Sequence, residues 1–465
     1  MRCMKIAVAV AAMGASSFAG DWEFFNAQYS PDKSAGREAD GALEMSVPSR
    51  RTCCWWEREF TVVPGNGVRF RAKAEVSLDA AEKALYNDLM MFVTWYDPSK
   101  GNRKDVRFYQ RDFMRYTDAT AAGGKVVRTF DDTFAVPADC NTIRVEFIAK
   151  WHVMKARISD VSIKTVDAPK PRKVRCVVGN PWQKPPSALL KSIAGKGGAG
   201  DGWSDPVAVR TCRLRQIEDT LTNIFANVEH PDIILFAEVF ADTGSPRLDL
   251  TSERIPGGPS FALASKYARA HRCYIAMNIH ERTDMDTYHN STFIVDREGR
   301  HVGTYRKVTL TSGEYMAGLV PGDDFGVFDL DFGRVGCLTC WDNWFSESAK
   351  YIRRKGAELL LFPLAGCNPD HIDISFPARA IDTGIPSLVA IRQGHLVSGI
   401  IDRDGRWIAT TMEDNGFAVA DIDLNARKRT FWLSVGPGGG DPYELYIDES
   451  RPELYERQDL RLPRR

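Results

Sequence analysis

The feature that most constrains the fold is a change in the spacing of apolar residues across residues 167–173, DAPKPRK. Upstream, apolar and polar residues alternate in short runs, and downstream, helical spacing alternates with continuous apolar runs. Prolines among charged residues are typical of an exposed domain boundary. The chain has 465 residues, whereas single cores rarely grow beyond ~250–300 residues. The sequence therefore predicts two domains, 21–166 and 174–435, with a linker at 167–173 and a C-terminal extension at 436–465.

The first domain is predicted to be all-β. Residues 68–76 and 143–149 alternate apolar with charged side chains, which is the period of a half-buried strand, so Arg144 and Glu146 are expected on the solvent side. Turn-forming sequences at 64–67, 97–101 and 136–139 punctuate the segment. Short alternating strands between turns are typical of a β-sandwich.

The second domain is predicted to be α/β with mixed strands. Apolar residues three and four apart between 214 and 228 indicate an amphipathic helix, and the apolar run at 231–236 indicates a strand buried on both faces. Further helices are expected at 260–271 and at 346–355, the latter ended by Gly356. Strands are expected at 274–277, at 335–339 and at 359–362, the last ended by Pro363, with hairpins around 296–299 and 402–405.

The N-terminus has the pattern of a secretory signal peptide. Arg2 and Lys5 precede an apolar run, and small residues follow up to Ala19, where cleavage is expected. The sequence therefore predicts export to the periplasm or the extracellular space, and no other run is apolar and long enough for a membrane anchor. Lys plus Arg and Asp plus Glu both number 61, so no net charge favours nucleic acid as a partner.

Three residues at strand ends could share one piece of chemistry. Cys340 lies between a predicted strand and a predicted helix, a position that exposes a nucleophile and lets the N–H of Trp341 face a developing oxyanion. Glu238 ends a buried strand and suits proton transfer. Lys307 follows the hairpin and, beside the thiol, would lower the thiol pKa and hold negative charge.

Three segments resemble the motifs of the nitrilase superfamily, in the same order. They are residues 232–238 (DIILFAE), 305–307 (YRK) and 336–342 (GCLTCWD). The spacings also fit, since 307 − 238 = 69 and 340 − 307 = 33. Flanking segments at 288–299, 355–363, 376–380 and 397–405 resemble the family as well, so the likeness covers roughly residues 173–435.

This resemblance implies an α-β-β-α sandwich that pairs across its helical layer into a four-layer dimer or a higher homo-oligomer. It implies a catalytic triad of Glu238, Lys307 and Cys340 without metal or other cofactor, and a second glutamate for which Glu314 is the best match. One departure concerns the family's Pro-Glu pair after the nucleophile, because this chain has Ser346 before Glu347. Substrate-pocket candidates are Asn343, Trp344 and Arg379.

The resulting expectation is an amidase-like hydrolase of a non-peptide carbon–nitrogen bond in a small amide or N-carbamoyl compound. Nitrile hydrolysis on the same triad is one alternative, and a non-catalytic binding protein on this scaffold is another. A further alternative is a zinc site formed by Cys337, Cys340, Cys367 and His371. Another is a redox pair formed by Cys337 and Cys340.

The first domain also resembles the jelly-roll sandwiches that accompany secreted carbohydrate-active enzymes, in its pattern of short strands and turns but in no specific motif. That resemblance implies a carbohydrate-binding-like module that contacts glycans. A role in packing or oligomerisation is the alternative, and no binding residue can be carried over.

Overall fold

The computed structural model describes residues 22–440 except 79–87, 101–109, 115, 121–124, 182–191, 193–204, 242–246, 393–395, 427–429 and 432–438. The chain divides into two compact units, which we call the β unit (residues 1–170 and 427–465) and the α/β unit (residues 171–426). The predicted signal peptide lies outside the described residues, and so does the predicted extension apart from Gly439 and Gly440.

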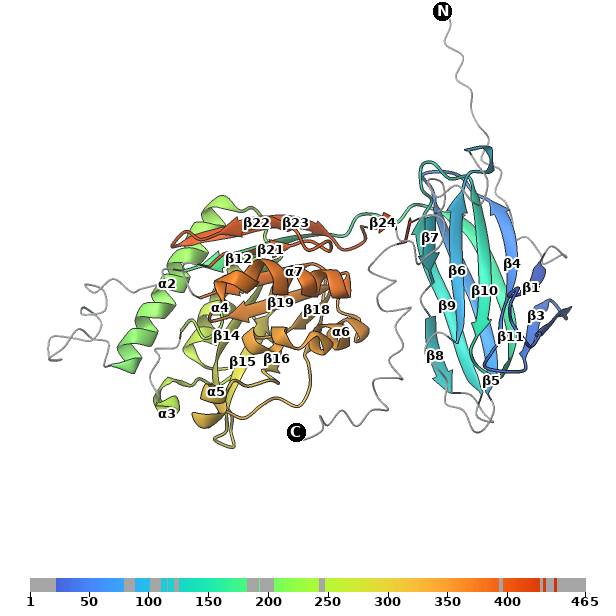
Figure 1. Cartoon of the computed structure of the whole chain (residues 1–465). Helices are drawn as coiled ribbons and strands as arrows, with labels where there is room; N and C mark the ends of the chain where they lie inside the picture. The colour runs from blue at the N-terminus through green and yellow to red at the C-terminus, as the bar shows by residue number, and fades with distance from the viewer. Residues whose placement is uncertain are drawn as a thin grey trace, which may run out of the picture. The chain divides into compact units, whose positions relative to one another are not determined.

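The described part of the β unit consists of two sheets (Figure 1). Sheet A has the order β1 (Glu23–Asn26), β4 (Cys53–Thr61), β10 (Thr142–Lys150), β6 (Leu89–Tyr96), β7 (Gln110–Phe113), β25 (Gly439–Gly440) and β24 (Thr430–Phe431). Sheet B has the order β2 (Ala35–Ala39), β3 (Ala42–Val47), β11 (Met154–Val166), β5 (Gly67–Leu78), β9 (Val126–Ala135) and β8 (Tyr116–Thr120). A short 3-10 helix, η1 (Pro98–Lys100), follows β6.

One apolar core joins the two sheets. Alternate residues of β5, among them Phe70 and Ala74, meet alternate residues of β10, among them Val145 and Phe147. The alternation read from the sequence therefore marks the inward face of both strands. The outward face of β10 differs from the prediction, because Arg144 and Glu146 are only 7% and 5% exposed. Arg144 Nε lies 3.6 Å from Glu146 Oε2. This ion pair offsets part of the free-energy cost of burying the two charges.

The α/β unit has two further sheets with helices (Figure 1). Sheet C has the order β16 (His301–Arg306), β15 (Tyr288–Val295), β14 (Tyr274–Arg282), β13 (Ile233–Leu235), β12 (Lys173–Asn180) and β23 (Gly416–Asp423). Sheet D has the order β17 (Val327–Leu330), β18 (Gly333–Cys337), β19 (Leu359–Leu364), β20 (Ser387–Ile391), β21 (Ser398–Ile401) and β22 (Trp407–Thr411). The helices are α2 (Pro206–Asn227), α3 (Leu248–Thr251), α4 (Pro259–His271), α5 (Ser312–Met316), α6 (Ser346–Arg354) and α7 (Ile372–Thr383), with 3-10 turns η4 (Cys340–Trp344) and η5 (Pro369–His371).

The layers of this unit follow from its apolar clusters. One cluster lies between sheets C and D and includes Leu235, Ile294, Leu361 and Leu388. A second cluster packs α2 and α4 on the other face of sheet C. On sheet D, α6 approaches β18 so closely that a Cβ on Gly336 would lie 2.2 Å from Ile352 Cγ2. The order helix, sheet, sheet, helix results.

Pro363 lies inside β19, whereas the sequence places it just after that strand. The neighbour explains the difference. Strand β18 pairs only with Leu359, Leu360 and Leu361, and the N–H of Leu338 donates to the carbonyl of Leu361. Pro363 points to that same side, beyond the end of β18, so its missing N–H breaks no bond to a strand there.

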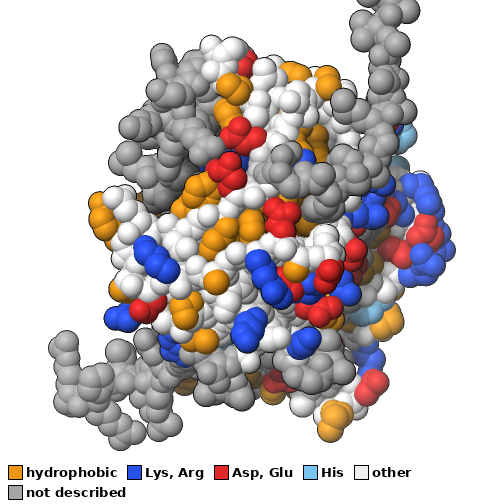
Figure 2. Space-filling view, turned by 90° about the vertical axis from the view of Figure 1, so that its right-hand side faces the viewer, with side chains coloured by type: hydrophobic (Ala, Val, Ile, Leu, Met, Phe, Trp, Pro, Cys, Tyr) orange, Lys and Arg blue, Asp and Glu red, His pale blue; other side chains and the backbone are white. Residues whose placement is uncertain are grey.

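The surface carries charges of both signs. Figure 2 shows one side of the molecule, on which Lys and Arg side chains lie close to Asp and Glu side chains and hydrophobic side chains form small groups. Among the described residues, no helix is long and apolar enough to cross a membrane.

Candidate active site

Glu238 lies three residues beyond β13, in a backbone turn that the buried side chain of Asn278 holds in place. The next residue, Val239, has φ +42°, and its N–H donates to Asn278 Oδ1 at 2.9 Å. Glu238 itself is 3% exposed. Its Oε2 accepts the N–H of Ala365 at 2.6 Å, so the carboxylate is fixed between the ends of β13 and β19.

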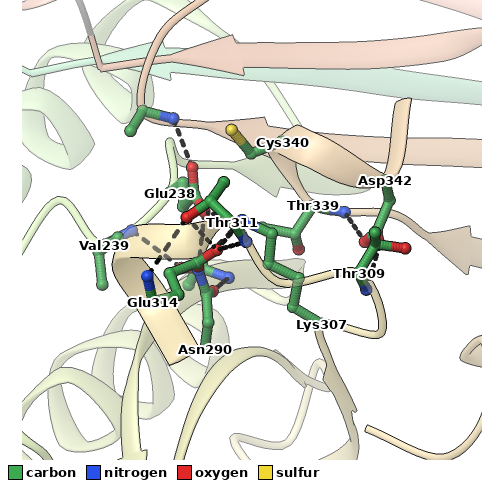
Figure 3. Close-up of polar contacts among 12 residues, drawn as sticks. Glu238, Val239, Asn290, Lys307, Thr309, Thr311, Glu314, Thr339, Cys340 and Asp342 are labelled. Carbon is green, nitrogen blue, oxygen red and sulfur yellow. Dashed lines mark hydrogen bonds and ion pairs between the residues drawn. The ribbon is translucent and has the colours of Figure 1, made fainter. Parts of the chain in front are cut away.

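Lys307 directly follows β16 and is 1% exposed. Its Nζ lies 3.1 Å from Glu238 Oε1 and 2.9 Å from each carboxylate oxygen of Glu314 (Figure 3). Burial alone lowers the pKa of Lys307, but the two carboxylates outweigh it and hold this pKa above its ordinary value. The ammonium therefore stays charged, and with two carboxylates around it the cluster has a formal charge of minus one.

The structure brings Glu314 into the same cluster, at the start of α5. Its side chain and that of Thr311 form a capping box, in which Glu314 Oε2 accepts the N–H of Thr311 at 2.7 Å. Burial raises the pKa of Glu314, but the charge of Lys307 and the hydrogen bonds from Thr311, Lys307 and Asn290 together leave the pKa below its ordinary value. Glu314 is thus a fixed anion that helps to hold the ammonium.

Asn290 of β15 joins the two glutamates, and the sequence assigned it no role. Its Nδ2 donates to Glu238 Oε1 and to Glu314 Oε1, both at 2.7 Å, while its Oδ1 accepts from Asn278 at 2.9 Å. The signal was a run of polar residues, YHNST at 288–292, in a strand that is otherwise buried. A buried polar run implies internal hydrogen-bond partners.

Cys340 begins the 3-10 turn η4, three residues after β18 ends at Cys337. The sequence placed it directly at the strand's end, but Leu338 and Thr339 intervene. Its φ of +46° is unusual for a residue other than glycine and marks local strain. Figure 3 shows its sulfur beside the Glu238 carboxylate, and Sγ also lies 3.9 Å from the carbonyl oxygen of Gly366.

The expected lowering effect of Lys307 on the Cys340 thiol is present, but it does not decide the pKa of that thiol. Burial and the charge of Glu238 raise the pKa well above its ordinary value, and they outweigh the opposing effect of Lys307. Burial is the largest of these effects. The carboxylate of Glu238 lies beside this thiol and could accept its proton.

A buried carboxylate fixes the turn around Cys340. Asp342 Oδ2 accepts the hydroxyl of Tyr305 at 2.6 Å and the N–H of Thr339 at 2.9 Å, while Oδ1 accepts the N–H of Thr309 at 2.8 Å. Asp342 therefore ties the turn that carries Cys340 to the segment that carries Lys307. The sequence did not assign this role.

The remaining predicted residues lie in η4, except Arg379, which lies in α7. Trp341 and Trp344 are 40% and 42% exposed, with ring centres 6.1 Å apart. Asn343 is buried and donates to Ser375 Oγ at 3.1 Å. Arg379 donates to the carbonyl of Asn343 at 3.1 Å and forms an ion pair with Asp382. Asn343 and Arg379 thus connect η4 to α7.

The zinc alternative has no support in the described geometry. Cys337 is fully buried in the core between sheets C and D. Within the part of the chain that the structure describes, no three His, Cys, Asp or Glu side chains form a group that could hold a metal ion. The nine cysteines of that part are all free thiols, so no disulfide links Cys337 to Cys340.

Comparison with known proteins agrees with this geometry. The sequence model of the carbon-nitrogen hydrolase family matches residues 212–430. A probable nitrilase, C965.09, of Schizosaccharomyces pombe is 30% identical over 261 residues, which are 52% of this chain and 91% of that protein. A citrullinase of Francisella tularensis is 28% identical and covers 55% of this chain and 93% of that protein. An N-carbamoylputrescine amidase of Oryza sativa is 30% identical and covers 37% of this chain and 62% of that protein.

Among solved structures, an amidase of Nesterenkonia sp. shares 18% identity, with a TM-score of 0.46, over 61% of this chain and 95% of that one. The chain belongs to the carbon-nitrogen hydrolase family of the nitrilase superfamily, as the sequence motifs predicted. It is a carbon–nitrogen hydrolase.

Proposed function

We propose that this protein is an amidase-like hydrolase that cleaves a non-peptide carbon–nitrogen bond of a small amide or N-carbamoyl compound with Cys340, Glu238 and Lys307. The observation that supports this most is the buried cluster in which a neutral thiol lies beside a carboxylate that also binds a buried ammonium. A thiol, a base and a cation together can carry acyl transfer. Relatives whose names denote amide or ureido hydrolysis support this substrate class.

In the first step Glu238 takes the proton of Cys340 while sulfur bonds to the carbonyl carbon. The carbonyl oxygen gains the negative charge, which Lys307 and the N–H of Trp341 stabilise. Glu238 then returns the proton to the nitrogen as the carbon–nitrogen bond breaks. Ammonia or an amine leaves, and the acyl group remains on Cys340 as a thioester.

Water completes the reaction. Glu238 removes a proton from water as its oxygen attacks the thioester carbon, and the proton then returns to sulfur when the carbon–sulfur bond breaks. The free acid leaves and the resting thiol is restored. Glu314 contacts Lys307, and Asn290 contacts both Glu238 and Glu314, so these two residues keep Lys307 and Glu238 in place throughout.

A panel of amides, N-carbamoyl compounds and nitriles, assayed for ammonia or amine release, tests this proposal. We expect turnover of at least one amide or carbamoyl compound, and a mass increase on Cys340 equal to the acyl group when turnover is stopped by acid. Cys340→Ala should lose both signals, whereas Cys367→Ala, the matched loss of another partly exposed thiol, should retain them.

The outcomes separate the alternatives. Turnover of nitriles alone would replace the amidase proposal by nitrilase activity on the same residues. Binding of amides without turnover by the wild type would favour a non-catalytic binding protein. Full activity in Cys340→Ala would reject the assignment of the nucleophile.

The predicted export and dimer also belong to this proposal. We expect the mature chain to begin after Ala19 in the exported fraction, because residues 1–19 have the pattern of a signal peptide. Sedimentation should show at least a dimer, as the resemblance to the superfamily implies. N-terminal sequencing and sedimentation of the exported protein measure both.

A further inference from the structure

The outward face of sheet B is open to solvent, unlike that of sheet A. From Val68 to Ser77 of β5, buried inward residues alternate with half-buried or exposed outward residues. Strand β6 of sheet A is instead buried at all of its positions. Sheet B therefore offers a wide, accessible sheet face.

Basic residues dominate this face. The cross-strand register places eight Lys and Arg residues and three acidic residues at outward positions of β2, β3, β5, β9 and β11 and next to β9. They are Arg37, Arg69, Arg71, Lys73, Lys125, Lys155, Arg157 and Lys164 against Glu44, Glu75 and Asp131. Since the whole chain has no formal net charge, this positive excess is local.

The carboxylates on this face are shared, so they leave part of the positive charge unmatched. Glu44 accepts from Arg37 at 2.7 Å and from Arg157 at 2.5 Å. Asp131 pairs with Arg69 at 2.9 Å and with Arg71 at 3.1 Å. One carboxylate between two guanidinium groups neutralises one of two charges. An added anion would therefore find unmatched guanidinium groups already in place.

A hollow of about 380 Å³ lies at one end of the face. Its charged and hydroxyl lining consists of Arg37, Lys125, Lys155 and Arg157, the carboxylates of Glu44 and Glu75, and the hydroxyls of Ser46 and Ser77. This volume is within the range of small-molecule sites, ~300–1,000 Å³. The hollow could hold one charged ring of a ligand. If the ligand is a polymer, its following units could lie along the rest of the face.

The types of side chain that this face lacks limit the classes of ligand that it could bind. None of the large hydrophobic side chains that are exposed in the described residues occupies one of its outward positions. The face therefore has no side chain to insert into a membrane and no ring to stack on a base. A sheet face also lacks the helix or ribbon that enters a groove of duplex DNA. Charge and hydroxyl groups are the remaining means of recognition.

We propose that the outward face of sheet B binds an anionic polysaccharide, carboxylated or sulfated, with its first charged sugar in the hollow at Arg37, Lys155 and Arg157. Each exposed ion pair contributes little, so affinity depends on many contacts along the polymer. The same reasoning predicts strong salt dependence, because screening shortens the range of charge interactions from ~30 Å at 0.01 M to ~3 Å at 1 M salt.

Binding of the full chain to immobilised polygalacturonate, dextran sulfate and neutral dextran tests the proposal. We expect retention on one or both anionic polymers at low salt, release as salt rises, and no retention on dextran. K73E/K155E/K164E should bind at least tenfold more weakly, and its melting curve should match that of the wild type. The control K33E/R50E/K170E makes the same charge change outside the strands of sheet B and should bind as the wild type does.

Two further measurements separate this proposal from the catalytic one and from other ligands. Cys340→Ala should bind the polymer normally, so a failed catalytic proposal would not affect this one. Duplex DNA and phosphatidylserine vesicles are offered at the same salt. Equal retention on neutral dextran, tighter binding to DNA or vesicles than to either anionic polymer, or equal loss in both triple variants would each overturn the proposal.

Discussion

At the scale of single residues, the candidate site is a balance of charges rather than a lone reactive thiol. Glu238 raises the pKa of Cys340, and the same carboxylate binds the ammonium of Lys307. A thiol that is protonated at rest reacts slowly with unwanted electrophiles. In the proposed mechanism it becomes nucleophilic only when a substrate carbonyl and the base act together.

Glu238→Gln should therefore lower the pKa of Cys340 while it removes turnover. The amide cannot accept a proton, so hydrolysis should fall at least 10²-fold. It also removes the negative charge that disfavours the thiolate, so iodoacetamide should alkylate Cys340 with a pH midpoint below that of the wild type. Peptide mass analysis across pH measures this midpoint, with Cys367 as the internal control. A midpoint that rises or stays fixed would contradict the charge balance.

Asn290 is expected to matter through both glutamates that it contacts. Asn290→Ala removes two hydrogen bonds to charged groups, each worth about 1.5–3 kcal/mol, so kcat/KM should drop about 10–100-fold. Asn290→Asp should be worse than Asn290→Ala, because it would place a third carboxylate beside Glu238 and Glu314. Steady-state kinetics on folded variants tests this order. An active Asp variant would show that the amide only fills space.

The ion pair of Lys307 and Glu314 should stabilise the fold only in the pH range where both groups are charged. The pKa of Glu314 is lowered from 4.5, so its contribution is complete above about pH 4.5 and disappears as pH falls through the lower folded value. The pKa of Lys307 is raised from 10.5, so its contribution disappears only above that pH. The Tm difference between wild type and Glu314→Gln should be constant from about pH 5 to 10 and shrink in acid. A difference that grows in acid would contradict this sign.

At the scale of elements, two connections hold the site together, and both are tertiary. Asp342 links the turn after β18 to the segment after β16, and Gly336 lets α6 approach β18. The sequence predicted the strands and helices around these residues from apolar spacing and capping residues. It could not assign Asn290 or Asp342, because most of their partners are distant in the sequence: 24 and 52 positions from Asn290, and 33 and 37 positions from Asp342.

Asp342→Ala should destabilise the α/β unit by about 3 kcal/mol or more, because three donors lose a buried acceptor at once. Tyr305→Phe removes only one of these donors and should cost about 1 kcal/mol. Denaturant unfolding of both variants measures the difference. Equal losses would show that Asp342 does not connect the two segments.

At the scale of the whole molecule, the chain combines two units with separate apolar cores. The sequence predicts a linker at 167–173 from its prolines and charges, and the structure divides the chain between residues 170 and 171. It did not foresee that residues 430–431 and 439–440 form strands with sheet A, since such short segments carry no periodic pattern. The charge of sheet B was visible only once the register placed alternate residues on one face.

Because each unit has its own core, we expect calorimetry to show two unfolding transitions that respond to different substitutions. Phe147 is fully buried in the β unit, so Phe147→Ala should cost about 3–5 kcal/mol there and lower one transition. Asp342→Ala should lower the other. An anionic polysaccharide should raise only the transition that Phe147→Ala lowers, because a ligand stabilises the unit that binds it. A single transition shifted equally by both variants would mean that the two cores unfold as one.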